Sequence, residues 1–331
     1  MYERQTETAR QKNRRRAVRR QRMLLFGILI VILLTVILIL SCCGRGAQAP
    51  QTAPQQTVPG SSAEGTTARQ AEPLPEGWEY RASEDLGIRD GTLVLVNADH
   101  GFDPALPETV SVYDNMTGSY LVKDIYLSLT EEAMAALNDW MDAFAAQSGR
   151  RDVNIVAGWR SFEDQQAIYD NAVATKGQAH ADAYIALPGC SEHHTGLALD
   201  LDTYDLASGT SGGFDGDGAY TWAVEHAWEY GFVQRYPPEK SAITGISYES
   251  WHFRYVGLPH SYIMSTEDLC LEEYIELLRQ HPFTGEHLKA SCQGAEYEIY
   301  FCPQDALVVP SGRPYTVSGN NVDGYVVTVH H

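Results

Sequence analysis

The stretch SEHHTGLALDLD, from Ser191 to Asp202, combines a strand pattern with side chains that bind metals. From Gly196 onward the residues alternate with the two-residue period of a β-strand. The apolar members of this alternation, which would face a core, are Leu197, Leu199 and Leu201. The opposite face consists of small and acidic residues, namely Gly196, Ala198, Asp200 and Asp202. The stretch therefore predicts a strand with room for a ligand and an ion on its open face.

Several polar residues around this strand are candidates for that site. His193 lies just before the strand and can close onto its open face. His194 cannot point the same way as His193 on an extended chain, so we expect it to be structural. Asp202 shares the face of Asp200, and periodicity alone does not separate these two carboxylates.

A second stretch, YESWHFRYV at 248–256, supplies further groups for a metal site. Zinc binds imidazole nitrogen and carboxylate oxygen, and catalytic zinc sites keep one position open for water. His193, Asp200 and His252 thus form a candidate His₂Asp ligand set. Glu249, three residues before His252, is then free to act as a general base on the water.

A third stretch, GWRS at 158–161, is a predicted turn between a strand at 152–157 and a helix at 162–174. Arg160 in such a turn can donate paired hydrogen bonds to a carboxylate or to a developing oxyanion. Gln165 follows four residues after Ser161 and belongs to the predicted helix.

The elements predicted around these motifs are helices and short strands. Predicted helices are 128–147, which Ser128 would cap with Glu131 three residues later, 162–174, 221–230 and 271–279. Predicted strands are 93–97, 110–112, 152–157, 297–301, 306–309 and 326–329. Segregated helices and strands favour an α+β fold over a parallel α/β sheet.

The N-terminal part of the chain has the composition of a membrane anchor. Residues 23–40 are 18 residues without a charge, and residues 41–43 extend this run. A helix needs about 20 apolar residues to cross a bilayer. Arginines directly before the run predict a cytoplasmic N-terminus. The alternatives are a cleaved signal peptide, whose apolar run is usually shorter, and lipid attachment at Cys42 or Cys43.

Five segments are predicted from this pattern. They are a basic cytoplasmic arm at 1–22, a transmembrane helix at 23–43, a flexible linker at 44–75, a zinc-binding domain at 76–281 and a small C-terminal β appendage at 282–331. The linker is rich in Gln, Ala, Thr, Pro, Gly and Ser, and this composition cannot bury a core. We therefore expect a single-pass protein of the cell membrane with its folded domain outside.

Charge is distributed unevenly along the chain. The formal net charge is −19, although residues 1–22 hold nine Arg and Lys against two Glu. The folded part is therefore strongly acidic and lacks the basic surface that nucleic-acid binding requires.

Four of the six cysteines lie outside the anchor region. Cys292 and Cys302 flank the strand-like run EYEIYF and are candidates for a disulfide across a hairpin, the alternative being two free thiols. The chain contains no CxxC pattern, so a cysteine zinc site is not expected.

Together these motifs resemble the VanY-type D-alanyl-D-alanine carboxypeptidases, which belong to a zinc metallopeptidase group with lysostaphin-type and Hedgehog-like domains. The pattern SxHxxGxAxD falls on residues 191–200, and Glu249, Trp251 and His252 follow in the family's order. GWRS at 158–161, where the family commonly has GYRS, and GFVQRYPPEK at 231–240 also match. The resemblance covers roughly residues 120–280.

The resemblance implies a role for each candidate residue. It makes His193, Asp200 and His252 the zinc ligands, and so selects Asp200 over Asp202. It makes Glu249 the catalytic base. It also implies that Arg160 and Gln165 contact the substrate or the transition state, and that Ser191 contacts the C-terminal end of the substrate.

The resemblance further implies a Hedgehog/D-Ala-D-Ala peptidase-like fold and a zinc carboxypeptidase that removes D-alanine from peptidoglycan stem peptides outside the membrane. An L,D-carboxypeptidase or an endopeptidase would use the same metal set. A non-catalytic wall-binding module is another alternative, although it would be expected to have lost a ligand or the base. The sequence leaves the oligomeric state open.

Overall fold

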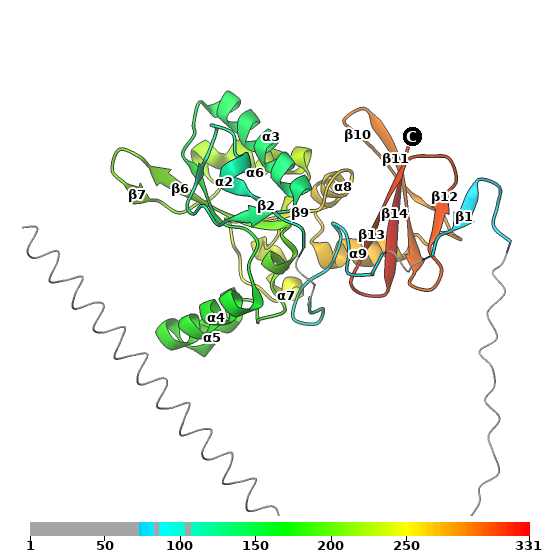
Figure 1. Cartoon of the computed structure of the whole chain (residues 1–331), viewed down its shortest axis with the longest axis horizontal. Coiled ribbons are helices and arrows are strands. Elements are labelled where there is room, and N and C mark those ends of the chain that lie inside the picture. The colour runs from blue at the N-terminus through cyan, green and yellow to red at the C-terminus, as the bar shows by residue number, and fades with distance from the viewer. Residues whose placement is uncertain (1–72, 83–85, 103–106) are drawn as a thin grey trace, which may run out of the picture. The chain divides into compact units, whose positions relative to one another are not determined.

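The computed structural model describes residues 73–82, 86–102 and 107–331, which belong to the unit Ala71–His331 (Figure 1). The predicted basic arm, the predicted transmembrane helix at 23–43 and residues 44–72 of the predicted linker lie outside the described residues. Among the residues that are described, no helix is both long enough and apolar enough to cross a membrane. The domain boundary at 281/282 stays a prediction.

A mixed sheet carries the candidate site. Its strands follow the order β3-β5-β6-β9-β8, with β7 paired to β6. β3 and β5 are parallel, and the other pairs are antiparallel. The bounds are β3 (Leu121–Val122), β5 (Val153–Ala157), β6 (Ala198–Asp205), β7 (Thr210–Ser211), β8 (Phe232–Gln234) and β9 (His252–Tyr255). β6 and β9 lie inside this order, so hydrogen bonds on both sides fix their positions.

One long helix, α3 (Glu131–Ser148), packs against this sheet (Figure 1). Leu137 and Trp140 of α3 share a buried cluster with Leu199 and Leu201 of β6. Leu197 belongs to the same cluster. The predicted apolar face of residues 196–202 is therefore confirmed, and Asp200 points to the opposite face of the strand.

The helix predicted from Ser128 begins later than expected. Ser128–Leu129 form strand β4, which pairs with β2 (Val110–Ser111). Thr130 is the N-cap of α3, and its hydroxyl accepts a hydrogen bond from the backbone N–H of Ala133. Ser and Thr are both good N-caps, so the sequence did not distinguish Ser128 from Thr130. A short helix, α2 (Val112–Asn115), directly follows β2.

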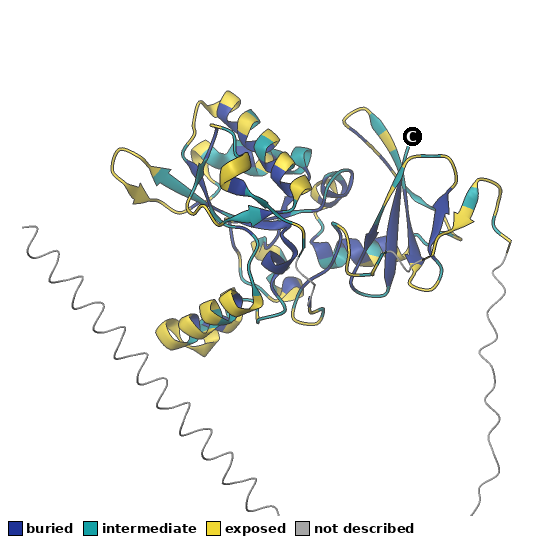
Figure 2. Ribbon diagram, in the orientation of Figure 1, coloured by how far each residue is buried: buried dark blue, intermediate teal, exposed yellow. Residues whose placement is uncertain are grey.

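Several helices lie beside the site strands or follow them. α4 (Phe162–Lys176) confirms the helix predicted at 162–174. It forms a helical pair with α5 (Gln178–Tyr184), and most residues of the pair are exposed (Figure 2). The predicted helix at 221–230 is divided into α6 and a 3₁₀ turn, and ends at Gly231 in the left-handed conformation (φ 82°). The remaining bounds are η2 (Glu192–Thr195), η3 (Gly218–Tyr220), α6 (Thr221–His226), η4 (Ala227–Tyr230), η5 (Pro238–Lys240), α7 (Ser241–Thr244), α8 (His260–Thr266) and α9 (Leu271–Arg279).

The C-terminal residues form a second, antiparallel sheet with the order β10-β11-β14-β13. Its strands are β10 (Leu288–Cys292), β11 (Ala295–Pro303), β13 (Tyr315–Gly319) and β14 (Gly324–His330). A separate strand pair joins β1 (Trp78–Tyr80) to β12 (Val308–Pro310). Residues that precede the mixed sheet in the chain therefore complete the C-terminal part of the fold.

The strand predicted at 93–97 is not formed. Leu93 to Val96 are buried, but their backbone groups bond outside any ladder. The N–H of Leu95 donates to the carbonyl of Asn320, and the carbonyls of Thr92 and Val94 accept from the Arg254 guanidinium. A buried apolar run was mistaken for a strand because burial alone gives it the same composition.

Of the two alternatives left open for Cys292 and Cys302, the structure has the free thiols and not the disulfide. Cys292 lies opposite Ala295 at the turn between β10 and β11, whereas Cys302 lies opposite Tyr325 near the other end of β11. One extended strand separates the two side chains, so no hairpin register brings them together.

Candidate metal centre

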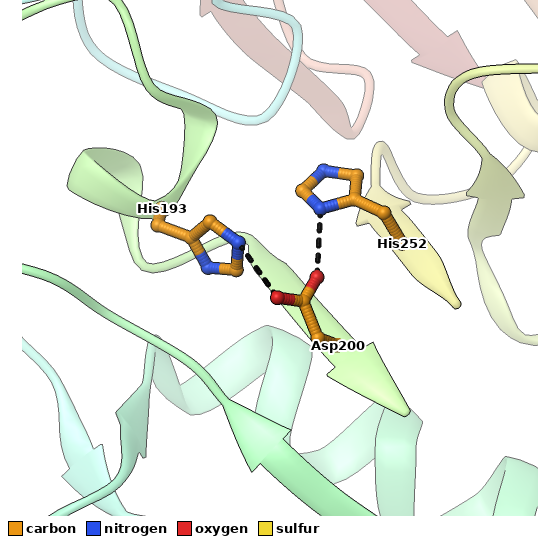
Figure 3. A group of neighbouring side chains, drawn as sticks. All are labelled: His193, Asp200 and His252. Atoms are coloured by element: carbon orange, nitrogen blue, oxygen red, sulfur yellow. Dashed lines mark hydrogen bonds and ion pairs between the residues drawn. The ribbon is translucent and has the colours of Figure 1, made fainter. Parts of the chain in front are cut away.

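Three side chains from two strands and one 3₁₀ turn converge on a single point (Figure 3). Asp200 on β6 and His252 on β9 are direct cross-strand partners, and Asp200 Oδ1 lies 2.9 Å from His252 Nδ1. His193, in η2, places its Nε2 atom 3.4 Å from Asp200 Oδ2. One ligand atom from each residue lies within 4.8 Å of the others. The predicted His₂Asp set is therefore assembled with its donor atoms facing one another.

Gly196 provides the turn that brings His193 over the strand. It adopts the left-handed conformation (φ 68°) between η2 and β6. A Cβ atom there would lie 3.1 Å from the Thr109 Cγ2 atom and 3.3 Å from that of Thr130. Both the conformation and the tight space therefore favour glycine.

The other ring nitrogen of His193 has a fixed partner. Nδ1 donates to the carbonyl oxygen of Gly158 at 2.8 Å. Burial, together with the nearby Arg160 charge, lowers the pKa of His193. The ring is therefore held neutral with the Nε2 lone pair toward Asp200, which is the form that binds a metal.

His252 lies between two carboxylates. Its Nε2 atom is 3.5 Å from Glu192 Oε2, on the side opposite Asp200. Burial alone would lower the pKa of His252, but the contacts with Asp200 and Glu192 raise it to about 9. Asp200 itself remains ionised, because the two histidines outweigh its burial and hold its pKa well below the usual range. The arrangement favours positive charge at this point, and a divalent cation would supply it.

Glu249 and the predicted ligands line one cavity of about 390 Å³. Burial, and the charge of Asp200, raise the pKa of the Glu249 carboxyl to about 7, although His252 and Arg160 act in the opposite direction. A carboxyl group with such a pKa can both accept and return a proton near neutral pH.

Arg160 is a cationic group of this cavity that lies beside the metal ligands. Its Nη2 atom lies 3.9 Å from Asp200 Oδ2. Its Nη1 atom donates to Gln165 Oε1 at 2.8 Å, and Gln165 Nε2 donates to the Ala186 carbonyl at 2.6 Å. Gln165 therefore orients the guanidinium toward the cavity.

All of the residues predicted for the site contribute to the lining of this cavity. They are Arg160, Gln165, Ser191, His193, Asp200, Glu249 and His252. Lys176, His180 and Tyr184 on α4 and α5 extend the same wall.

Two alternative residues do not join the metal centre. His194 Nδ1 donates to the Arg160 carbonyl, and its Nε2 accepts from the Gly189 N–H, so His194 supports the turn that carries Arg160. Asp202 lies opposite Asn154 in the sheet and accepts from the N–H of Thr203. The structure thus separates Asp200 from Asp202, which periodicity could not do.

Sequence reasoning missed a group of charged side chains beside His252, of which all but Glu272 are buried. They are Glu192, Arg235, Arg254 and Glu272. No spacing rule marks them, because their contacts join segments that are far apart in the chain. The only sign of this group in the sequence was that a charged residue, Glu192, directly precedes the predicted ligand His193.

Comparison with known proteins identifies the family. Residues 126–258 match the family model "VanY: D-alanyl-D-alanine carboxypeptidase". A D-alanyl-D-alanine carboxypeptidase of Enterococcus faecium is 34% identical over 267 residues, which are 77% of this chain and 80% of that protein. The chain belongs to the VanY family.

Two solved structures illustrate this VanY similarity. The vancomycin resistance D,D-dipeptidase VanXYg, solved with a D-Ala-D-Ala phosphinate analogue, is 32% identical with a TM-score of 0.67, and the match covers 77% of this chain and 99% of that chain. A mutant of the D,D-pentapeptidase VanY from a VanB-type resistance cassette, in complex with Zn(II), is 32% identical with a TM-score of 0.46, covering 56% of this chain and 98% of that chain. The VanY match at 126–258 includes every residue predicted for the site.

Proposed function

We propose that this chain is a zinc-dependent D,D-carboxypeptidase that removes the C-terminal D-alanine from peptidoglycan stem peptides. The observation that carries the proposal is one cavity that holds a His₂Asp donor set, a buried carboxyl group and an oriented guanidinium. Family membership supports the same reaction class.

His193, Asp200 and His252 are the residues that hold the metal. Two imidazole nitrogens and one carboxylate oxygen are typical ligands of a catalytic zinc ion with one open position. The donor set fits zinc because burial and the Arg160 charge lower the pKa of His193, while the Gly158 contact fixes its tautomer, and because the acidic surroundings of His252 favour a cation. When bound, zinc supplies the Lewis acid for hydrolysis.

Glu249 acts as the general base and then as the general acid. It takes a proton from the attacking water as the bond from oxygen to the scissile carbonyl carbon forms. It returns that proton to the amine of the leaving D-alanine as the carbon–nitrogen bond breaks. Burial raises the pKa of the Glu249 carboxyl group, and this favours its holding the proton between the two transfers.

Arg160 stabilises the negative charge that develops on the carbonyl oxygen. Its guanidinium is largely buried and is oriented by Gln165, so it is in place before the charge forms. Ser191 is buried in the cavity wall beside His193 and contacts the terminal carboxylate of the substrate.

The proposal extends to the location of the enzyme. Residues 23–43 cross the cell membrane once, with the basic arm in the cytoplasm and the peptidase domain outside. Support comes from the charge-free run and from the arginines directly before it. A tethered enzyme would meet its substrate in the cell wall.

The test is D-alanine release by the purified, zinc-loaded full-length chain. It is incubated separately with a stem pentapeptide ending in D-Ala-D-Ala and with a stem tetrapeptide ending in a single D-Ala. Release from the pentapeptide, abolished in Glu249→Ala, is the expected result. Release from the tetrapeptide alone would assign the L,D reaction instead.

Further outcomes distinguish the two remaining alternatives, an endopeptidase and a wall-binding module. If neither peptide releases D-alanine while one zinc ion is bound per chain, the carboxypeptidase proposal fails. Cleavage of a cross-linked peptide dimer under those conditions would then indicate an endopeptidase. Binding of the dimer without cleavage would indicate a wall-binding module.

A further inference from the structure

Glu192 is a completely buried carboxylate directly before the metal ligand His193. Its side chain is 0% exposed. One oxygen, Oε2, lies 3.5 Å from Nε2 of His252, the ring nitrogen that faces away from Asp200. The other oxygen, Oε1, accepts from Arg235 Nε and from Arg254 Nη1, both at 2.8 Å. Each carboxylate oxygen thus has its own partners.

The two arginines are themselves fixed. Arg235 donates from both Nη atoms to Glu272 on α9, at 2.9 and 2.7 Å. Arg254 Nη2 donates to the carbonyls of Thr92 and Val94, at 2.9 and 2.8 Å. A paired guanidinium–carboxylate contact defines direction as well as distance. Glu192 is therefore anchored from two sides by groups that have little freedom to move.

Burying Glu192 together with its two arginine partners costs free energy. The presence of these charges in the core therefore needs an explanation. A carboxylate without partners in this environment would be strongly destabilising. Here two carboxylates pair with two guanidinium groups. The charges of this cluster therefore cancel without a positive charge on His252. Stability alone does not explain it, because apolar side chains of similar volume often pack equally well. Efficient packing would not require an oxygen of Glu192 to be directed at His252.

We propose that Glu192 is a positioning residue for zinc binding. It accepts a hydrogen bond from His252 Nε2–H, which fixes the tautomer and leaves Nδ1 free for the metal beside Asp200. Glu272 on α9 supports this role through Arg235. The inference rests on the proposed zinc site, and it assigns part of that site's support to a residue outside the VanY match at 126–258.

The first test is zinc affinity, measured by competition with a chromophoric chelator. Glu192→Asp keeps the negative charge but withdraws the oxygen from His252, and Glu192→Gln removes the charge. We expect zinc binding to weaken by about 10–100-fold in both, as is typical for loss of a carboxylate behind a metal-bound histidine. Glu272→Gln should weaken binding in the same direction.

A matched control lies on the same helix. Glu276 on α9 is 61% exposed and pairs with Arg279, so Glu276→Gln should bind zinc as the wild type does. Folding of each variant is checked by circular dichroism and thermal unfolding. A folded Glu192→Asp variant that binds zinc within twofold of the wild type would overturn the inference.

The second test needs no variant and decides the matter if those variants do not fold. Zinc-loaded wild-type protein labelled with ¹⁵N at histidine should show the His252 proton on Nε2, protected from exchange and with the downfield shift of a hydrogen bond to a carboxylate. A proton on Nδ1, or an Nε2 proton that exchanges as freely as that of an exposed histidine, would contradict the proposal. Neither test uses peptide turnover, so the zinc results stand on their own if D-alanine release, and with it the proposed function, fails.

Discussion

Asp200 and Asp202 lie two residues apart on β6, yet only Asp200 faces both histidines. Asp200→Asn removes the anionic ligand, so we expect loss of stoichiometric zinc and a fall in D-alanine release on the order of 10³-fold. Zinc content and release are measured on the same preparation. Asp202→Asn is the control and should stay within about twofold of the wild type. Equal loss in both variants would contradict the assignment of Asp200.

Arg160 provides a second prediction at the residue scale. Arg160→Met should retain zinc but lower kcat by about 10²–10³-fold, because it removes a preorganised donor to the developing oxyanion. Arg151→Met is a suitable control, since Arg151 is exposed and donates to the Gly118 carbonyl away from the cavity. Steady-state kinetics with the pentapeptide separate kcat from KM. A kcat within threefold of the wild type would show that Arg160 only shapes the cavity.

How far the site could be predicted depends on the kind of signal each residue leaves in the sequence. The alternation around Asp200 and the short spacing from Glu249 to His252 are local, so both were visible. Glu192 has partners 43 and 62 residues away, at Arg235 and Arg254. Such contacts follow from tertiary packing and have no period, so the sequence alone did not reveal them.

At the scale of elements, the turn after β5 links strand geometry to the metal site. Gly158 accepts from His193 Nδ1, and a Cβ atom there would lie 2.5 Å from the Ser128 carbonyl oxygen. Gly158→Ala should therefore push β4 and the turn apart, cost about 1–3 kcal/mol of unfolding free energy and weaken zinc binding. Chemical unfolding and chelator competition measure the two effects.

The control for that substitution is another glycine of the peptidase part. Gly118 has an ordinary φ, and a Cβ atom there would meet nothing within 4 Å. Gly118→Ala should therefore leave stability and zinc affinity near the wild-type values. If Gly158→Ala behaves in the same way, the close approach at β4 does not position His193.

Prediction succeeded for elements with strong local patterns. The helix at 271–279 matches α9 residue for residue, because its apolar side and its polar ends are both encoded nearby. Residues 93–97 failed because the partners of this buried run, such as Ser318 and Asn320, come from the far end of the chain. Long-range pairing of this kind leaves no mark in a short window of sequence.

At the scale of the whole described unit, the two sheets are joined through buried contacts. The cluster that contains Leu93 and Leu271 also includes Val233 of the mixed sheet and Val326 of the C-terminal sheet. The predicted appendage at 282–331 therefore shares a core with residues before and within the peptidase part.

His260 lies in this shared region and makes folding sensitive to pH. It is buried in α8, with Nδ1 2.8 Å from the Tyr274 hydroxyl and Nε2 3.2 Å from Thr328 Oγ1 of β14. Burial lowers its pKa from 6.5 to about 3. The unfolded chain therefore binds a proton below pH 6.5 that the folded protein does not accept until about pH 3. Its contribution to stability is complete above pH 6.5 and is lost as the pH falls from 6.5 toward 3.

The expected loss is about 2 kcal/mol of unfolding free energy between pH 7 and pH 5. Urea unfolding of the wild type and of His260→Gln at both pH values isolates this contribution, because all other titrating groups, His252 included, are common to the two proteins. If His260→Gln loses as much stability on acidification as the wild type does, then His260 is not what makes the junction of the two sheets sensitive to acid.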